Sequence, residues 1–176
     1  MNDLFEILNK LDELKYGWID IYGETHLYSM KDFRKIYKTM SIETVLEKKL
    51  GICMEQVYLT HLLLDEKNIP NKMFCTRIYE DENFNDLDAR EHMHCFSLCY
   101  IDDFVYHIEH ANSEERGIYK YNSEDEAISK INAYYEALDR GHSRPVTEFF
   151  DLPVGLTFKE FNLYINSLGE YKRKWV

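Results

Sequence analysis

The sequence predicts an α+β fold in which helices come first, strands follow, and helices return at the end of the chain. Apolar residues recur at three- and four-residue spacings in residues 4–14 and 53–64, as they do on the buried face of a helix. Residues 72–80 and 94–110 instead read as strands, because aromatic and apolar side chains alternate with polar ones there. The 176 residues, 45% of them apolar, fit one domain over 1–176 with a buried core.

The first half of the chain is predicted to be mainly helical. A serine before an apolar, periodic run can cap a helix, because its hydroxyl accepts a hydrogen bond from the first turn. Glycine ends helices because it readily adopts the left-handed conformation. On these signals we expect a helix over 4–14, a hairpin over 16–28 that turns at Tyr22 and Gly23, a helix over 30–40 capped by Ser29, a helix over 42–50 capped by Ser41 and ended by Gly51, and a helix that starts at Cys53 and stops before Pro70.

The second half is predicted to contain the sheet and two further helices. A capping residue precedes each of these helices, and turn residues separate the strands. The acidic stretch 80–91 has no period, so we expect a loop there, either a solvated surface or a lid. The other expected elements are a strand over 72–80, two strands over 94–110 joined at Asp102 and Asp103, a helix capped by Ser123 and closed by Gly141, and a helix over 158–169 that Thr157 begins.

The hairpin over 94–110 allows side-chain neighbours to be derived from strand pairing. With the turn at residues 102–103, Glu109 falls opposite Phe96. Residues two apart on a strand share a face, so Glu109 is the diagonal neighbour of His94, at roughly 7–8 Å between backbones. A long side chain can close that gap. An acid within reach of an imidazole fixes the orientation and tautomer of the ring, as a catalytic histidine requires.

Cys53 stands at the predicted start of the core helix, two residues after Gly51. The free N–H groups and the positive dipole end of a helix stabilise a thiolate, and a nearby imidazolium lowers the thiol pKa further. The same N–H groups can hold the oxyanion of a tetrahedral intermediate, and Gly51 leaves room for a substrate carbonyl. Cysteine is also among the most buried residue types, so a purely structural Cys53 is the alternative.

Three segments carry a family resemblance: "GICMEQVYLTHLLL" with Cys53, "HMHCFSLCY" with His94, and "FVYHIEHA" with Glu109. They are similar to the transglutaminase-like superfamily, circularly permuted relatives of the papain-like cysteine enzymes, and in particular to a group of bacterial transglutaminase-like proteins. In that family a cysteine begins a core helix, a histidine begins one strand, and an acid ends the next strand. The resemblance extends from about residue 16 to 168.

The resemblance implies a papain-like, transglutaminase-like fold, in which N-terminal helices and the core helix pack on a small antiparallel sheet. It implies that Cys53 is the nucleophile, His94 the general base and acid, and Glu109 the group that orients the imidazole. The expected chemistry is attack on an amide or other acyl carbon of a peptide or protein. A thioester intermediate is then released to water or an amine, and no cofactor is needed. A binding or scaffold module with the same fold and no turnover is the competing interpretation.

Some positions depart from the usual pattern of the family. The usual acid is aspartate where this chain has Glu109, Met54 replaces the aromatic residue that often follows the nucleophile, and Phe96 replaces a tryptophan. The candidates for substrate binding are Gln56, which lies one turn after Cys53, His107, which lies on the sheet face that holds His94, and Trp18. Trp18, Tyr22 and Tyr28 are also candidates for a side-chain donor to the oxyanion.

Cys95, Cys99 and His110 share the opposite side of the predicted hairpin and invite a zinc interpretation. They lack the close-paired spacing of common zinc sites. We therefore expect the two cysteines to be core residues under a helix layer, and no metal to bind.

Composition and charge exclude several classes of function. The net charge of −11 repels a phosphate backbone, so nucleic acid is not an expected partner. The N-terminus lacks the basic and apolar parts of a signal peptide, and no apolar stretch approaches the roughly 20 residues that cross a bilayer, so no membrane partner is expected. The four cysteines form no CxxC pair, which favours free thiols and a cytoplasmic location. No pattern indicates an oligomeric state.

Overall fold

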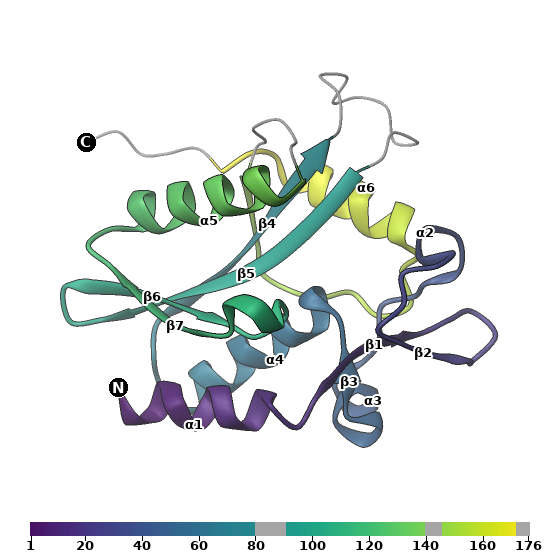
Figure 1. Cartoon of the computed structure of the whole chain (residues 1–176), viewed down its shortest axis with the longest axis horizontal. Helices are drawn as coiled ribbons and strands as arrows, with labels where there is room; N and C mark the ends of the chain where they lie inside the picture. Colours follow the sequence, from purple (N-terminus) through teal and green to yellow (C-terminus); the bar gives the residue numbers. More distant parts are fainter. Residues whose placement is uncertain (80–90, 140–145, 172–176) are drawn as a thin grey trace.

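The computed structural model describes residues 1–79, 91–139 and 146–171 and shows an α+β structure (Figure 1). This confirms the predicted fold class. The helices of the described residues are α1 (Asn2–Leu11), α2 (Phe33–Ile36), α3 (Ile42–Lys48), α4 (Cys53–Glu66), α5 (Glu124–Asp139) and α6 (Phe158–Leu168). The strands are β1 (Lys15–Ile19), β2 (Thr25–Leu27), β3 (Leu50–Gly51), β4 (Asn71–Tyr79), β5 (Glu91–Ile101), β6 (Phe104–Glu109), β7 (Gly117–Tyr121) and β8 (Val146–Phe149).

The larger sheet has the strand order β7-β6-β5-β4-β8, and each neighbouring pair is antiparallel. Figure 1 shows α5 over one face of this sheet and α1 and α4 over the other. A smaller sheet has the order β2-β1-β3. It lies next to the first turn of α4, because only Ile52 separates β3 from that helix.

Alternation along β5 divides its side chains between two cores. Phe96 packs with Ile128 of α5, whereas its neighbour Cys95 packs with Val57 of α4. Fully burying one large apolar side chain contributes about 1.5–3 kcal/mol, so each face is held to its own helix. By the same alternation, His94 lies on the α5 face.

The central hairpin has the predicted register, which is therefore confirmed. Leu98 pairs with His107, and Ile101 pairs with Phe104 around a two-residue turn. Asp102 adopts φ 54°, in the left-handed region that tight hairpin turns require and that aspartate tolerates. The first strand of the hairpin, β5, begins at Glu91 and not at His94 as predicted, because β4 pairs with it as far as Glu91.

The N-terminal predictions hold in part. The hairpin predicted over 16–28 is formed by β1 and β2. Ser41 caps α3 as predicted, with its side chain accepting a hydrogen bond from the backbone N–H of Thr44. However, α3 ends earlier than predicted, because Lys49 adopts the left-handed conformation (φ 52°), and Gly51 lies in β3 instead.

The helix predicted over 30–40 is wrong in extent, since only the four residues of α2 are helical. Ser29 does not cap it, and Tyr37 is already extended. The reason lies in tertiary contacts: the Thr39 N–H donates to the Leu156 carbonyl, which draws this segment toward the start of α6. Backbone hydrogen bonds to a distant segment thus replace those of the helix.

The two C-terminal helices begin where the capping signals predict. The Ser123 hydroxyl accepts a hydrogen bond from the Glu126 N–H at the start of α5. Thr157 and Glu160 exchange hydrogen bonds at the start of α6. No helix in the described part of the chain is long and apolar enough to cross a membrane.

Three strands, β3, β7 and β8, have no counterpart among the predicted elements. They are two, five and four residues long, so alternation has little length in which to show. β7 and β8 form the two edges of the larger sheet. The loop predicted over 80–91 lies outside the described residues except for its last residue, which begins β5, and Gly141 also lies outside them.

Candidate active site

Cys53 is the first residue of α4 and lies against β5. Its Sγ is 3.9 Å from the carbonyl oxygen of Met93. Ile52, the N-cap residue, makes no side-chain cap, because its apolar side chain cannot accept a hydrogen bond. The N–H groups of the first turn are therefore left without a side-chain cap beside the thiol.

Gly51 and Glu55 hold the start of α4 in place. A Cβ added at Gly51 would lie 3.2 Å from the Cβ of Glu55, so a larger residue would press on the first turn. The buried Glu55 carboxyl accepts hydrogen bonds from the Tyr37 hydroxyl and from the N–H groups of Met40 and Ile52. Burial raises the pKa of Glu55 to about 7, although these donors oppose the shift. The carboxyl ties the segment before α3 to the first turn of α4.

His94 and Glu109 form a buried pair between β5 and β6. His94 Nε2 lies 3.1 Å from Glu109 Oε2. The other oxygen of Glu109, Oε1, accepts a hydrogen bond of 3.0 Å from the Asn112 N–H, and the Tyr135 hydroxyl lies 3.3 Å from Oε2. The carboxylate is bonded at both oxygens, which holds it in one orientation toward the imidazole.

The imidazole of His94 interacts with the Cys53 thiol as well as with Glu109, and this interaction contributes to the pKa of both groups. Burial alone would lower the pKa of His94, but the charge of Glu109 and the bond to Cys53 outweigh it and raise that pKa to about 10. Burial would likewise raise the pKa of Glu109, but the charge of His94 lowers it to about 2.

The hydrogen bond from Cys95, with the bond and charge of His94, lowers the pKa of Cys53 well below its ordinary value, against the effect of burial. These opposite shifts of the two pKa values favour a thiolate–imidazolium pair of Cys53 and His94.

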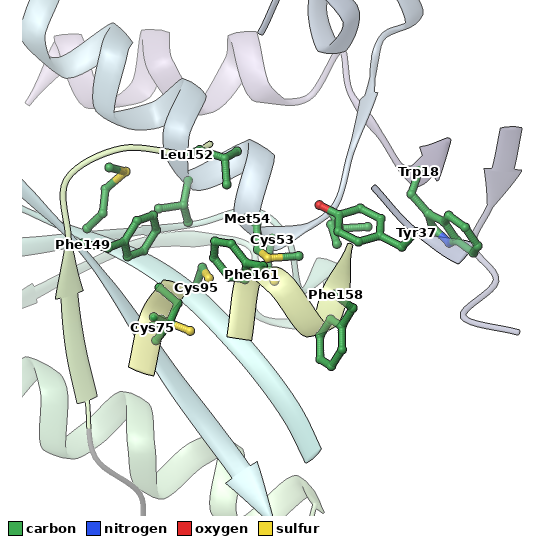
Figure 2. Close-up of a cluster of buried hydrophobic side chains, with 14 of the residues drawn as sticks. Trp18, Tyr37, Cys53, Met54, Cys75, Cys95, Phe149, Leu152, Phe158 and Phe161 are labelled. Atoms are coloured by element: carbon green, nitrogen blue, oxygen red, sulfur yellow. The ribbon is translucent and has the colours of Figure 1, made fainter. Parts of the chain in front are cut away.

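Cys95 and Cys75 extend the sulfur cluster behind Cys53. Figure 2 shows the three side chains close together in one buried cluster. Cys75 and Cys95 are direct partners across β4 and β5. Burial, with the contacts to Cys53 and Cys75, raises the pKa of Cys95 well above its ordinary value. Cys95 thus stays protonated, and its S–H stabilises the Cys53 thiolate.

Tyr135 of α5 covers the imidazole on the α5 face. The rings of Tyr135 and His94 are stacked, with centroids 3.9 Å apart and an interplanar angle of 26°. Burial raises the pKa of Tyr135 far above its usual value, so its hydroxyl remains a donor to Glu109. The aromatic ring keeps water from this side of the His94–Glu109 pair and holds the imidazole in its plane.

A cavity of about 550 Å³ opens beside Cys53. Its walls come from β1, the segment 30–35, the start of α4, β5 and the first residue of α6. Most of the lining is apolar, and Cys53 is part of it. The apolar lining residues are Met30, Phe33, Ile52, Met54, Met93 and Phe158.

Two of the predicted substrate-binding residues, Gln56 and His107, contact other parts of the protein and do not face the cavity at Cys53. The amide of Gln56 donates to the Gly51 carbonyl at 2.8 Å, and its oxygen lies 2.9 Å from His110 Nδ1. His107 is buried behind Glu109, with Nε2 3.5 Å from Oε2 of that carboxylate. Neither residue lines the cavity at the thiol. The structure instead gives both of them contacts within the protein.

The third predicted substrate-binding residue, Trp18, also lies away from the cavity. It is fully buried, and its Nε1 donates to the Ser29 carbonyl at 2.7 Å. Figure 2 shows it well separated from Cys53. Tyr22 and Tyr28, the other upstream aromatic candidates for an oxyanion donor, are exposed and do not line the cavity. None of the three is therefore placed to donate to an oxyanion at Cys53.

Tyr16 is an upstream aromatic residue with a hydroxyl group that does line the cavity with Cys53. Burial raises the pKa of its hydroxyl, which stays protonated. Neither Tyr16 nor Tyr135 is singled out by the sequence, because the chain has 14 tyrosines and none stands in a diagnostic motif. Glu55 was also missed; its place three residues after the N-cap is the one signal that indicates a role at the helix start.

Cys95, Cys99 and His110, the set considered for zinc, do not converge on one point. The two cysteines belong to different core clusters. His110 is engaged by Gln56 at Nδ1 and lies 3.3 Å from Asp12 at Nε2. The side chains are thus occupied in separate packing and hydrogen-bonding interactions.

Within the described ranges, one group of side chains is spaced closely enough to hold a metal ion: Asp20, Glu24 and His26 at the first hairpin. Asp20 accepts hydrogen bonds from the N–H groups of Tyr22 and Glu24 and lies 2.8 Å from His26 Nε2. These bonds stabilise the turn and account for the arrangement without a ligand.

No protein-family model matches this chain, and no curated protein matches its sequence. The relation to the transglutaminase-like superfamily therefore belongs to the proposal that follows, which depends on the geometry of the site.

Proposed function

We propose that this protein is a cysteine-dependent acyl-transfer or amide-hydrolysing enzyme with a transglutaminase-like arrangement of core helix and sheet. The main support is the imidazole of His94, which is bonded to Glu109 by its Nε2 and follows Met93, the residue whose carbonyl oxygen lies 3.9 Å from Cys53 Sγ. The interaction of His94 with the thiol also lowers the pKa of Cys53. A thiolate at the start of a helix, paired with an imidazolium, is a nucleophile at neutral pH. The proposed substrate is an amide of a peptide or protein.

In the first step the Cys53 thiolate attacks the carbonyl carbon, and the electron pair of the C=O bond moves to oxygen. The N–H groups at the start of α4 donate to this oxyanion. His94 then gives its proton to the leaving nitrogen, the C–N bond breaks, and a thioester remains on Cys53.

In the second step water or an amine attacks the thioester, and the now neutral His94 takes the proton of the attacking group. The C–S bond breaks, and the Cys53 thiolate forms again. Glu109 keeps the ring oriented and stabilises the imidazolium each time it forms. Glu109 therefore supports both steps without touching the acyl group.

The direct test replaces the nucleophile. Cys53→Ala should abolish turnover on a panel of peptide amides and glutamine peptides offered with an amine acceptor. The stability cost should be on the order of 1 kcal/mol, because the change opens little space. Cys99→Ala is the matched control, since Cys99 is also a buried thiol but lies in a different core cluster, and it should leave turnover intact.

Labelling of the wild-type thiols supplies a test that needs no substrate. Iodoacetamide at pH 6 should modify Cys53 much faster than Cys75, Cys95 or Cys99, because the pKa of Cys53 is lowered and Cys53 opens into the cavity. A wild-type protein that is inert on the whole panel and slow to label at Cys53 would refute the proposal.

A binding or scaffold module is the second candidate, and the burial of the triad favours it. Cys53, His94 and Glu109 are 7%, 5% and 4% exposed, as members of a polar core network would be. In that case Glu109→Gln should cost about 1–3 kcal/mol of stability by weakening the support of His94, with no activity to lose. Thermal melts of this variant beside Cys53→Ala, together with turnover of the wild type, distinguish the two candidates.

A further inference from the structure

The cavity at Cys53 has an apolar floor next to the reacting sulfur. Ile52 and Met54 flank Cys53 in the chain, and Met93 is the strand residue whose carbonyl lies 3.9 Å from Sγ. Phe158 contributes a ring from the start of α6. A group attached to the carbonyl that Cys53 attacks must therefore lie against apolar side chains.

The charged side chains of the lining belong to α2 and the residue before it. Lys35 lies 3.5 Å from Asp32, and the Arg34 guanidinium lies 5.8 Å from the centre of the Phe158 ring. These groups therefore partly balance one another within the cavity wall. The residues that adjoin Cys53 in the chain or at its Sγ are instead the apolar Ile52, Met54 and Met93.

The size of the cavity is suited to a large group. A volume of about 550 Å³ lies within the usual range of ligand pockets and exceeds what a methyl or carboxymethyl side chain would fill. Met30, Met54 and Met93 contribute flexible thioether chains, which adapt to aromatic and long aliphatic shapes.

We infer that the acyl half of the substrate carries a large apolar group, an aromatic or long aliphatic side chain, next to the carbonyl that Cys53 attacks. The group would lie in the cavity between α2, α6 and the start of α4, while the leaving amine stays outside the apolar pocket. This inference rests on the proposed function, because it assigns the substrate class of the same thiol.

Irreversible probes test the inference without turnover. N-acetyl-phenylalanyl and N-acetyl-glycyl chloromethyl ketone both alkylate a thiolate, which forms a C–S bond as chloride leaves, and they differ only in the side chain. Second-order rates at Cys53 follow from intact-mass measurements over time, with iodoacetamide as a small reference reagent. The phenylalanyl probe should react about 10- to 100-fold faster than the glycyl probe, the range expected for burying one large apolar side chain.

Variants of the lining locate the preference in the cavity. Met93→Gln keeps the length of the side chain but makes it polar, and should reduce the phenylalanyl-to-glycyl ratio at least threefold; iodoacetamide labelling of the same variant is the reference for any change in thiol reactivity. Met30→Gln, at the more exposed part of the lining, repeats the test should the first variant be unstable. Leu46→Gln is the control, since Leu46 is an exposed apolar residue of α3 that does not line the cavity.

The outcomes separate the inference from the proposed function. Fast iodoacetamide labelling with a ratio near one, or an aspartyl probe that outpaces the phenylalanyl one, would overturn the substrate class and leave the nucleophile in place. A ratio unaffected by both methionine variants would also overturn it. Slow labelling of Cys53 by every reagent would overturn the proposed function and the inference together.

Discussion

Two buried histidines lie beside the same carboxylate oxygen of Glu109, but their pKa values are shifted in opposite directions. Nε2 of His94 is 3.1 Å from Oε2 of Glu109, and Nε2 of His107 is 3.5 Å from it. Burial by itself lowers the pKa of both rings. For His94 the charge of Glu109 and the bond to Cys53 outweigh burial, so that its pKa rises to about 10, whereas burial lowers the pKa of His107 to about 4.

The difference between the two rings is in their other partners. His94 has a second anion, the Cys53 thiolate, within hydrogen-bonding reach. His107 Nε2 has no hydrogen-bond partner among the described residues, and the positive charge of His94 opposes a second charge beside it. One carboxylate thus supports one imidazolium, and a nearby acid alone does not make a buried histidine basic. Only His94 is charged at neutral pH and able to protonate a leaving group.

The strongest test of this comparison replaces each histidine by glutamine. His94→Gln should lower kcat/KM by about 1,000-fold, because it removes both the proton donor and the partner of the thiolate. His107→Gln should change kcat/KM by less than about threefold, since a neutral ring outside the cavity takes no part in either step. Steady-state kinetics on one amide substrate measures both effects. Equal losses in the two variants would contradict the distinction.

Removing the charge of Glu109 should bring the two histidines closer in pKa. In Glu109→Gln the carboxamide keeps the shape of the side chain, but His94 loses the charge that raises its pKa. Labelling of Cys53 at pH 6 should fall about 100-fold, while labelling near pH 9.5, where a free thiol ionises by itself, should change little. The pH profile of the iodoacetamide rate is the measurement. Glu66→Gln, at an exposed position near the end of α4, is the control and should leave the profile unchanged.

Tyr135 provides a finer test, because it stacks on His94 and not on His107. Tyr135→Phe keeps the ring and should slow labelling at pH 6 about two- to threefold, by loss of one hydrogen bond to Glu109. Tyr135→Leu removes the stack and should slow it about tenfold, again mainly on the acidic side of the profile. A uniform loss at all pH values would indicate a packing role alone. Tyr164→Phe, whose hydroxyl bonds the Asp151 carbonyl, is the control.

The smallest expected effect is on stability at acid pH. The folded-state pKa of His107 is lowered from 6.5 to about 4, so the unfolded chain binds a proton in this window that the folded chain does not. His107 therefore reduces stability as the pH falls from 6.5 to 4, by on the order of 1–3 kcal/mol. In His107→Gln that loss should be absent, and urea melts at pH 7 and pH 4.5 should show a smaller difference than in the wild type. An unchanged difference would mean that His107 is already charged in the fold.

The approach of Glu109 to His94 follows from sequence alone, and the physical reason is local. The turn at residues 102–103 sets the register, and the period of two places both side chains on one face. The start of α4 at Cys53 is also local, because the helical spacing of apolar residues begins there. Signals of this kind act over one hairpin or one helix, within which the chain itself brings the residues together.

The surroundings of the triad were decided by tertiary structure. Tyr135 meets Glu109 from 26 residues away, on a helix whose rotation over the sheet depends on the packing of its own Ile128 against Phe74 and Phe96 of the sheet. The predicted helix over 30–40 is cut short because the Thr39 N–H donates to the Leu156 carbonyl. Met30 and residues 32–35 of the same segment form a wall of the cavity.

Trp18 and Gln56 were predicted to bind substrate, but their tertiary contacts place them elsewhere. Both residues have the chemistry of a binding site, but Trp18 is buried under aromatic neighbours and Gln56 is held by Gly51 and His110. The sequence determined the register that pairs Glu109 with His94 and the helix start at Cys53, because both are encoded within short segments. Only the tertiary structure decided what covers them and where a substrate can enter, because those contacts join segments whose separation in the chain carries no periodic signal.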